Sequence, residues 1–246
     1  LYLPDATNWN YTETRPVYKW FKEKLMVDLS SNAESLVAKK IMADGLFARF
    51  TKKLLDQADL QINNIEVEKK VITTEDLPDD MPEEIKTFLS GKDAISIQLG
   101  HLIGDEVHEL SLANESDGTQ KIFGLSLYFN DVLLNGGILV IDELENSLHP
   151  HIVQFLANLF ADPMQNKNGA QLIFSTHNTS LLNLELFRRD QIWFTEKNPE
   201  QLSTELYSLF DIKARRDENP AKGYLTGRYG AIPVLGSGIL FPVDNQ

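Results

Sequence analysis

Apolar residues recur at helical spacing in two segments of the first half of the chain. The first predicted helix covers 15–27, where apolar side chains stand four positions apart. A capping-box pattern at 31–34 opens the second helix, which extends over about 33–56 and has Gly45 as its weak point. The chain is therefore expected to begin with helical segments.

Strand patterns follow these helices. Residues 61–73 alternate between polar and apolar side chains, as a half-exposed strand does. The acidic segment 74–84 contains two prolines and predicts a solvated loop. Residues 95–99 and 106–112 then predict a pair of strands, joined by a turn at Gly104-Asp105 that is typical of a hairpin.

The pattern changes near residue 115, after which helices and short apolar strands follow one another. The predicted elements are a helix over 119–134, a strand over 137–141, a helix over 150–161, and strands over 171–175 and 190–194. A short apolar run bounded by glycines is typical of a strand buried on both faces. Strands that alternate with helices predict an α/β fold with a sheet of parallel character.

Composition narrows the classes of protein that fit this pattern. The 246 residues include 42% hydrophobic residues and no cysteine, which excludes disulfide scaffolds, thiolate metal sites and cysteine nucleophiles. No uninterrupted apolar run approaches the roughly 18 residues of a membrane-spanning helix, and we expect a cytoplasmic protein without a membrane partner. The net charge of −13 opposes binding of DNA or RNA by the whole surface.

The strongest chemical motif is the apolar run over 138–141, which ends in Asp142 and Glu143. In an α/β sheet, ligands collect at the carboxyl ends of the strands. An aspartate there can hold Mg²⁺ directly or through water, because this ion prefers hard oxygen ligands. The next carboxylate, Glu143, can accept a proton from an attacking water molecule. This is the Walker B arrangement, and the alternative is a buried strand that simply ends in an acidic loop.

Three further segments carry candidate chemistry. Residues 145–150, directly after the acids, read Glu-Asn-Ser-Leu-His-Pro. Residues 174–178 end the next predicted strand, and His177 there could hydrogen-bond a terminal phosphate. Residues 114–120 open a helix with a serine, a glycine and free backbone amides, which together can make an anion site. An ordinary structural histidine and an ordinary helix cap are the alternatives for the last two segments.

Other sites stay open on the residues alone. Asp142, Glu143 and Glu145 could form a two-metal nuclease site. The histidines lack metal-ligand spacing, apart from the pair on either side of Pro150, so a zinc site has little support. The basic run at 213–216 is typical of a solvated face, although it could meet nucleic acid or an acidic partner.

In order and spacing, these motifs resemble the signature, Walker B, D-loop and switch histidine of ABC-type ATPases of the SMC and RecF kind. The sequence is closer still to the RloA-like, restriction-associated AAA-family ATPases, which share its Ser-Asp-Gly-Thr, Ser-Leu-His-Pro and Ser-Thr-His-Asn segments. Residues 188–194 and 224–233 look like theirs as well. The resemblance covers about 95–235. It implies an α/β ABC-type P-loop ATPase head, with a RecA-like lobe and a helical insertion.

The resemblance implies a role for each matching residue. Asp142 would organise Mg²⁺, Glu143 would polarise the attacking water, and His177 would sense the γ-phosphate of ATP. A homodimer or higher homo-oligomer would bind nucleotide between its heads, and closing the dimer would switch the site. The residues that would contact the partner protomer's nucleotide or span the dimer are Ser116, Asp117, Gly118, Thr119, Ser147 and His149.

The 246 residues contain no Walker A motif, because the Gly-Lys pair Gly91-Lys92 is followed by Asp93. We therefore expect the C-terminal part of an ATPase head, without the N-terminal strand and P-loop, and with little ATPase activity on its own. The expected division is a helical insertion with edge strands over 1–94 and the C-terminal ATPase lobe over 95–246.

The resemblance implies an ATPase whose ATP-driven dimerisation controls a separate effector, a nuclease or toxin, in antiviral or restriction defence. The alternative is a DNA repair or chromosome-maintenance ATPase of the RecF or SMC type. The short helical segment 33–56 disfavours it, because that segment lacks sustained heptads. A non-catalytic interaction module is disfavoured by the presence of Glu143 and His177. The acidic net charge favours protein partners over nucleic acid.

Overall fold

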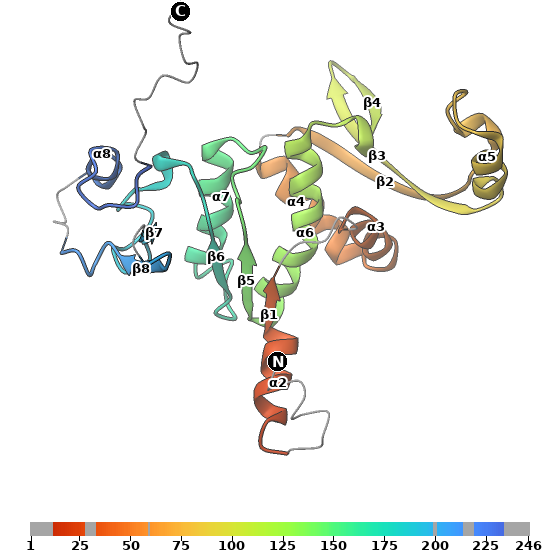
Figure 1. Cartoon of the computed structure of the whole chain (residues 1–246). Helices are drawn as coiled ribbons and strands as arrows, with labels where there is room; N and C mark the ends of the chain where they lie inside the picture. Colours follow the sequence, from red (N-terminus) through yellow and green to blue (C-terminus); the bar gives the residue numbers. More distant parts are fainter. Residues whose placement is uncertain (1–11, 28–32, 59, 199–200, 214–218, 234–246) are drawn as a thin grey trace, which may run out of the picture. The chain divides into compact units, whose positions relative to one another are not determined.

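The computed structural model describes residues 12–27, 33–58, 60–198, 201–213 and 219–233 (Figure 1). The chain divides into two compact units, Leu1–Thr176 and His177–Gln246, each with its own packing. The division expected from the sequence, between residues 94 and 95, stays a prediction.

A three-stranded parallel sheet in the order β1-β5-β6 belongs to the first unit. β5 (Ile138–Ile141) pairs with β1 (Leu25–Val27) on one side and with β6 (Gln171–Phe174) on the other. Leu139 and Ile141 on β5 are buried, since alternate residues of a strand face the same side of a sheet. The predicted α/β fold with a parallel sheet is confirmed.

The first predicted helix is shorter than its pattern indicated. α2 spans Arg15–Lys24, and the chain continues from Leu25 as the strand β1. The partner of Leu25 is Ile138, far away along the sequence. The backbone N–H and C=O groups of 25–27 form hydrogen bonds with β5 rather than within a helix. The prediction of a helix over 25–27 was therefore wrong, because the spacing of apolar residues does not show a distant strand partner.

The second predicted helix is interrupted. α3 (Ala33–Ala43) and α4 (Gly45–Gln57) meet at Asp44, whose carboxylate accepts hydrogen bonds from two amides in the first turn of α4. Asp44 has extended backbone and acts as an N-cap, which starts a new helix rather than continuing the old one. Residues 31 and 32 of the predicted capping box lie outside the described residues.

Two further predicted helices, α6 (Asp117–Asn135) and α7 (Pro150–Ala161), are confirmed and run alongside the sheet (Figure 1). The ring of Phe129 on α6 meets that of Phe160 on α7 edge to face, with centroids 5.4 Å apart. α3 and α4 also pack against α6. No helix within the described ranges is long and apolar enough to span a membrane.

The C-terminal end of α6 is fixed by side chains from two distant segments. Asn168 Nδ2 donates hydrogen bonds to the carbonyl oxygens of residues 133–134, at 3.0 and 2.8 Å. Lys24 Nζ donates to the carbonyl oxygens of residues 135–136, at 2.7 and 3.0 Å. These carbonyls have no partner within the helix, and the lysine charge complements the negative end of the helix dipole.

A second sheet of the first unit is antiparallel, in the order β2-β3-β4. β2 (Ile62–Val71) pairs with β3 (Asp93–Ile103), and β3 pairs with β4 (Glu106–Ser111). Gly104 has a φ of 65°, which the tight turn between β3 and β4 requires. The predicted strands and their hairpin are confirmed.

β2 and β3 form an arm that carries the short helix α5 (Glu83–Leu89) at its far end (Figure 1). The predicted loop over 74–84 contains a 3₁₀ turn, η1 (Thr74–Asp76), and the first residues of α5. A helix of this length is too short to show a helical period. None of its residues is buried.

The second unit contains an antiparallel pair of strands. β7 (Trp193–Lys197) pairs with β8 (Thr204–Ser208). The strand predicted over 190–194 therefore begins later and does not extend the parallel sheet. Its partner β8 follows directly in the sequence, and such a short connection allows only antiparallel pairing. The unit also contains η3 (Thr179–Leu181) and α8 (Pro220–Leu225).

Aromatic side chains form the core of the second unit. Phe194 stacks on Tyr224 with centroids 5.6 Å apart, and Tyr229 packs on the same ring at 5.8 Å. The hydroxyl of Tyr207 lies 2.7 Å from Tyr229 O and 3.1 Å from Glu196 Oε2. Burial, together with the neighbouring Glu196 carboxylate, raises the pKa of Tyr207 to about 12. Two of these rings, those of Tyr224 and Tyr229, belong to the C-terminal segment 224–233.

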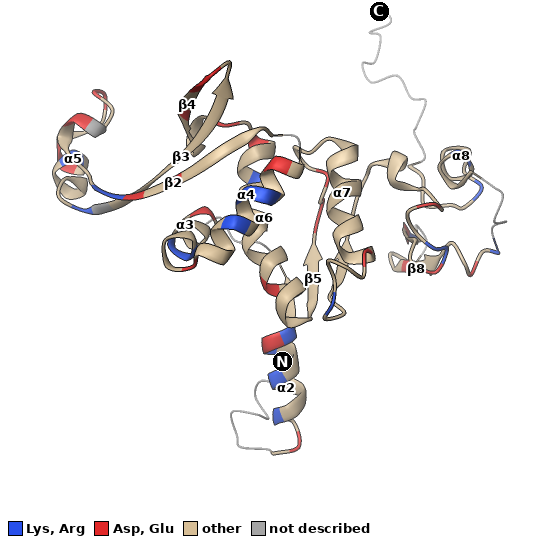
Figure 2. Ribbon diagram, turned by 180° about the vertical axis from the view of Figure 1, so that it is seen from behind, with Lys and Arg blue, Asp and Glu red and all other residues tan. Residues whose placement is uncertain are grey.

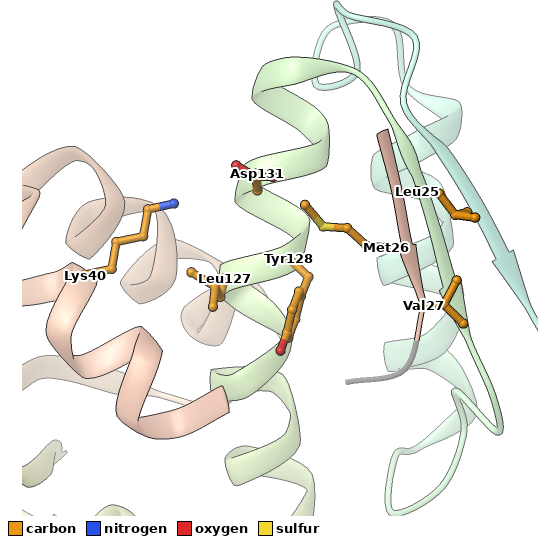
Figure 3. Close-up of a pocket in the computed structure, with 7 residues that line it drawn as sticks. All are labelled: Leu25, Met26, Val27, Lys40, Leu127, Tyr128 and Asp131. Atoms are coloured by element: carbon orange, nitrogen blue, oxygen red, sulfur yellow. The ribbon is translucent and has the colours of Figure 1, made fainter. Parts of the chain in front are cut away.

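A pocket of 420 Å³ lies between β1, α3 and α6 (Figure 3). Met26 points from β1 toward α6, and Lys40 reaches from α3 toward the same helix. None of the candidate site residues lines it. The lining residues are Leu25, Met26, Val27, Lys40, Leu127, Tyr128 and Asp131.

Gly136→Ala tests how tightly the end of α6 is joined to Asn168. Gly136 has a φ of 63°, and a Cβ there would collide with the carbonyl oxygen of Asn168. Gly169→Ala is the matched control, because its φ is 68° but no atom lies within 4 Å of its Cβ. The free energy of unfolding in urea should fall by about 1–2 kcal/mol for the control and by a further 1–3 kcal/mol or so for Gly136→Ala. Equal losses would contradict the close contact.

Candidate functional site at the carboxyl edge of the parallel sheet

Asp142 and Glu143 follow β5 directly, at the carboxyl end of the parallel sheet. Ser175 follows the neighbouring strand β6, and its Oγ donates a hydrogen bond to Oδ1 of Asp142. The N–H of Glu143 donates to the same Oγ over 2.8 Å. Ser175 thus holds both acids. The sequence reasoning missed this role, although a hydroxyl directly after an apolar strand was a visible signal.

The residues after β5 form a strained turn, which we call the acid loop (142–148). Glu143 and Ser147 have φ values of 48° and 62°, in the left-handed region. This conformation costs about 1–2 kcal/mol for a residue with a Cβ atom. Leu144 and Leu148 are buried and anchor the loop, and two turn hydrogen bonds of 3.0 and 2.8 Å close it. The fold therefore imposes the backbone on which the acids stand.

The N-terminal turn of α6 lies beside the acid loop and follows η2 (Leu112–Asn114). Ser116 is the N-cap, and its Oγ accepts a hydrogen bond from the N–H of Thr119 over 3.2 Å. The hydroxyls of these two residues are 2.9 Å apart. Asp117 stands in the first turn, where a negative charge complements the helix dipole. The predicted helix start is confirmed, and the Ser116 hydroxyl serves as its cap.

Gly118 places the first turn of α6 directly against the acid loop. A Cβ atom built on Gly118 would lie 2.7 Å from the carbonyl oxygen of Ser147, closer than real Cβ contacts allow. Only glycine fits there without a shift of the backbone. The structure thus brings together two segments that the sequence identified separately, the one opening α6 and the one following the acids.

Lys121, one turn further along α6, also reaches the acid loop. Its Nζ donates hydrogen bonds to the carbonyl oxygens of Glu143 and Asn146, both at 3.0 Å. Burial lowers the pKa of the Lys121 ammonium, while the negative charges of Glu145 and Glu143 act in the opposite direction. No motif pointed to this lysine, because its partners are backbone atoms of a distant segment.

A contact outside the motifs holds the segment just before α6. His101 Nε2 on β3 lies 2.6 Å from Oε1 of Glu115, whose side chain is mostly buried. Because Glu115 precedes the N-cap Ser116, this contact joins the antiparallel sheet to the start of α6. Spacing along the sequence could not reveal it.

The two histidines of the predicted site occupy different surroundings. His149 caps α7, and its Nδ1 accepts a hydrogen bond from the N–H of His151 over 3.2 Å. His177 is exposed and is the first residue of the second unit. The D-loop role of His149 and the sensing role of His177 stay predictions.

Asp142 offers the carboxylate oxygens that Mg²⁺ prefers, and Ser175 orients one of them. In the part of the chain that the structure describes, no group of three or more His, Cys, Asp or Glu residues could hold a metal ion. The residues present fit an ion that takes one carboxylate from the protein and completes its shell with water and phosphate oxygens. The assignment of Mg²⁺ to Asp142 stays a prediction.

In a parallel α/β sheet, ligands bind at the carboxyl ends of the strands, which is where Asp142 and Glu143 lie. Residues 10–183 match the family described as "AAA domain, putative AbiEii toxin, Type IV TA system". Because this match covers more than half of the chain, the chain belongs to that family of AAA-type ATPase domains. No curated protein matches the sequence.

Three solved structures are similar at a low level. One, from work on ATP-driven dimerization and DNA stimulated activation of SMC ATPases, has a TM-score of 0.41 at 12% identity, over 74% of this chain and 99% of that one. The SmcHead bound to the C-winged helix domain of ScpA has a TM-score of 0.41 at 11% sequence identity, and the match covers 74% of this chain and 54% of that chain. The third is the Smc head domain with an extended coiled coil, bound to the C-terminal domain of ScpA derived from Pyrococcus furiosus. It has a TM-score of 0.38 at 11% sequence identity, and the match covers 66% of this chain and 34% of that chain. Scores of this size support no inference about the site.

Gly118→Ala should loosen the acid loop, because the added Cβ would push the Ser147 carbonyl away. Gly124→Ala in the same helix is the matched control, since its Cβ would meet only Ala33 Cβ, at 3.4 Å. In urea denaturation, the free energy of unfolding should fall by about 1–3 kcal/mol for Gly118→Ala. It should stay equal or rise for the control, because alanine favours a helix. Similar values for both variants would refute the contact.

Proposed function

We propose that the chain is part of an ATP-binding and ATP-hydrolysing ABC-type ATPase of the RloA-like kind. ATP-driven dimerisation of this ATPase controls a separate effector, a nuclease or a toxin, in antiviral or restriction defence. The observation that carries the proposal is the position of Asp142 and Glu143 at the carboxyl edge of a parallel sheet, both held by Ser175. Membership of the AAA-type family supports it.

The proposed chemistry follows from the charges in the site. Asp142 would hold Mg²⁺, and the ion would supply positive charge that neutralises the phosphates. Glu143 is exposed, and its carboxylate orients the attacking water and accepts its proton. His177 senses the γ-phosphate. Phosphoryl transfer depends mostly on positioning and charge stabilisation, so the fixed backbone of the acid loop is part of the mechanism.

Nucleotide binding in the proposal is divided between two protomers. The proposal places a phosphate of the partner's nucleotide at the positive end of α6, in the first turn that contains Ser116, Asp117, Gly118 and Thr119. Ser147 and His149 belong to the D-loop that spans the dimer. Gly118 and Ser147 are in contact within one protomer, so the proposal links the two segments to each other.

Two observations support a protein effector. The family description names a toxin of a toxin–antitoxin system, which fits a defence role. The net charge of −13 opposes nucleic acid as the main partner, and Figure 2 shows acidic and basic positions interspersed along α2, α6 and the arm.

Glu143→Gln in the complete ATPase should bind ATP and stop hydrolysis, because the amide cannot accept the proton of water. Turnover should fall about 100-fold or more, and the ATP-bound dimer should accumulate in light scattering after gel filtration. Glu106→Gln, on the exposed hairpin, is the control and should behave as the wild type. Unchanged turnover in Glu143→Gln would remove the assignment of the general base.

The complete protein should bind double-stranded DNA weakly, with a Kd no tighter than about 1 μM at physiological salt, as expected of non-specific contacts alone. Fluorescence anisotropy with a labelled duplex at two salt concentrations measures this. Tight binding, together with faster ATP turnover on adding DNA, would instead favour the RecF- or SMC-like alternative.

A further inference from the structure

We infer that Lys121 is a positioning residue that ties the acid loop to α6 and so couples the signature segment to Glu143. This role rests on the proposed function and deepens it, because it names the path by which a phosphate bound at the start of α6 acts on the hydrolytic acid. Lys121 itself touches no nucleotide in this scheme.

The geometry is that of a two-point tether. The Lys121 ammonium donates to the carbonyl oxygens of Glu143 and Asn146 at the same distance, 3.0 Å. These two carbonyls lie on either side of the turn that contains Leu144, so one cation spans the first half of the acid loop. An ammonium has three donors, and two of them are used here.

The acid loop needs such a tether because it is strained. Glu143 and Ser147 are left-handed, and neither is a glycine. Strained residues persist only where their surroundings hold them on several sides. Ser175 holds the Glu143 N–H from β6, and Lys121 holds the Glu143 carbonyl from α6, so the peptide groups on both sides of this residue are fixed.

The surroundings of Lys121 make the tether electrostatic as well as geometric. Burial lowers the pKa of the Lys121 ammonium, and the carboxylates of Glu145 and Glu143 act in the opposite direction, toward the charged form. Hydrogen bonds from a charged donor in such surroundings are stronger than those between neutral groups. An uncharged side chain of the same length leaves two carbonyls without this donor.

The tether and the Gly118 contact lie on successive turns of one helix. α6 is buried along much of its length, and a close-packed interior transmits strain rather than absorbing it. A displacement of its first turn, where the proposal places the partner's phosphate, therefore shifts the Glu143 carbonyl and the Ser147 carbonyl together. The hydrolytic acid takes its working position only when α6 is in place.

Hydrogen–deuterium exchange of the chain without nucleotide tests the tether directly. Lys121→Met keeps the apolar stem and removes the donors. Exchange of the acid-loop amides should rise about tenfold or more, and Lys121→Arg should restore much of the protection. Lys39→Met, at an exposed position on α3, is the matched control and should leave the loop unchanged. Lys121→Gln, which retains a donor, replaces Lys121→Met if the latter does not fold.

ATP turnover of the complete ATPase supplies the second measurement. Lys121→Met should lower kcat about tenfold or more while KM stays within about twofold, since it disturbs positioning rather than binding. Unchanged acid-loop exchange in Lys121→Met would overturn the tether, and a loosened loop with wild-type kcat would overturn the link to Glu143. A wild-type protein that does not hydrolyse ATP would refute the proposed function, while the exchange measurement would still decide whether the tether exists.

Discussion

The close packing of α6 on the acid loop is the constraint on which the rest of the site depends. Gly118 leaves room for one carbonyl of the loop, and Lys121 binds two others. α6 is itself packed against α3 and α4, so the acid loop is fixed to a close-packed core. Ser175 completes the support from the sheet. In this way a short surface turn keeps the backbone of Glu143 and Ser147 in a costly left-handed conformation.

Elements whose signals are local were predictable from the sequence. The apolar run predicted β5, the serine cap predicted the start of α6, and the proline in the first turn predicted the start of α7. The composition of Gly104-Asp105 predicted the turn between β3 and β4. Predictions that depend on distant partners failed. Residues 25–27 have helical spacing but pair with β5, and Asp44 breaks an apparently continuous helix by capping its second half.

In the candidate site, too, features with local sequence signals were predicted and features that depend on distant partners were not. The sequence correctly predicted that Asp142 and Glu143 follow a strand at the edge of the sheet and that residues 114–120 open a helix. Both positions could be predicted because strand ends and helix caps depend on neighbouring residues. Ser175 and Lys121 were not identified, since their partners are backbone or side-chain atoms more than twenty residues away. The left-handed backbone of Glu143 was equally hidden, because nothing in an Asp-Glu pair distinguishes it from an ordinary turn.

The reach of Lys24 to the end of α6 bears on the order in which this unit is built during synthesis. β1 and Lys24 are synthesised before their partners at residues 135–140, which follow more than a hundred positions later. The parallel pairing contributes no stabilising contacts until the two strands meet, which requires the long intervening segment to form a closed loop. Closing so long a loop is slow. The antiparallel arm pairs segments that are nearer in sequence, while α3 and α4 pack on each other and on the later helix α6. We therefore expect the parallel sheet that carries the acids to be completed after the antiparallel arm.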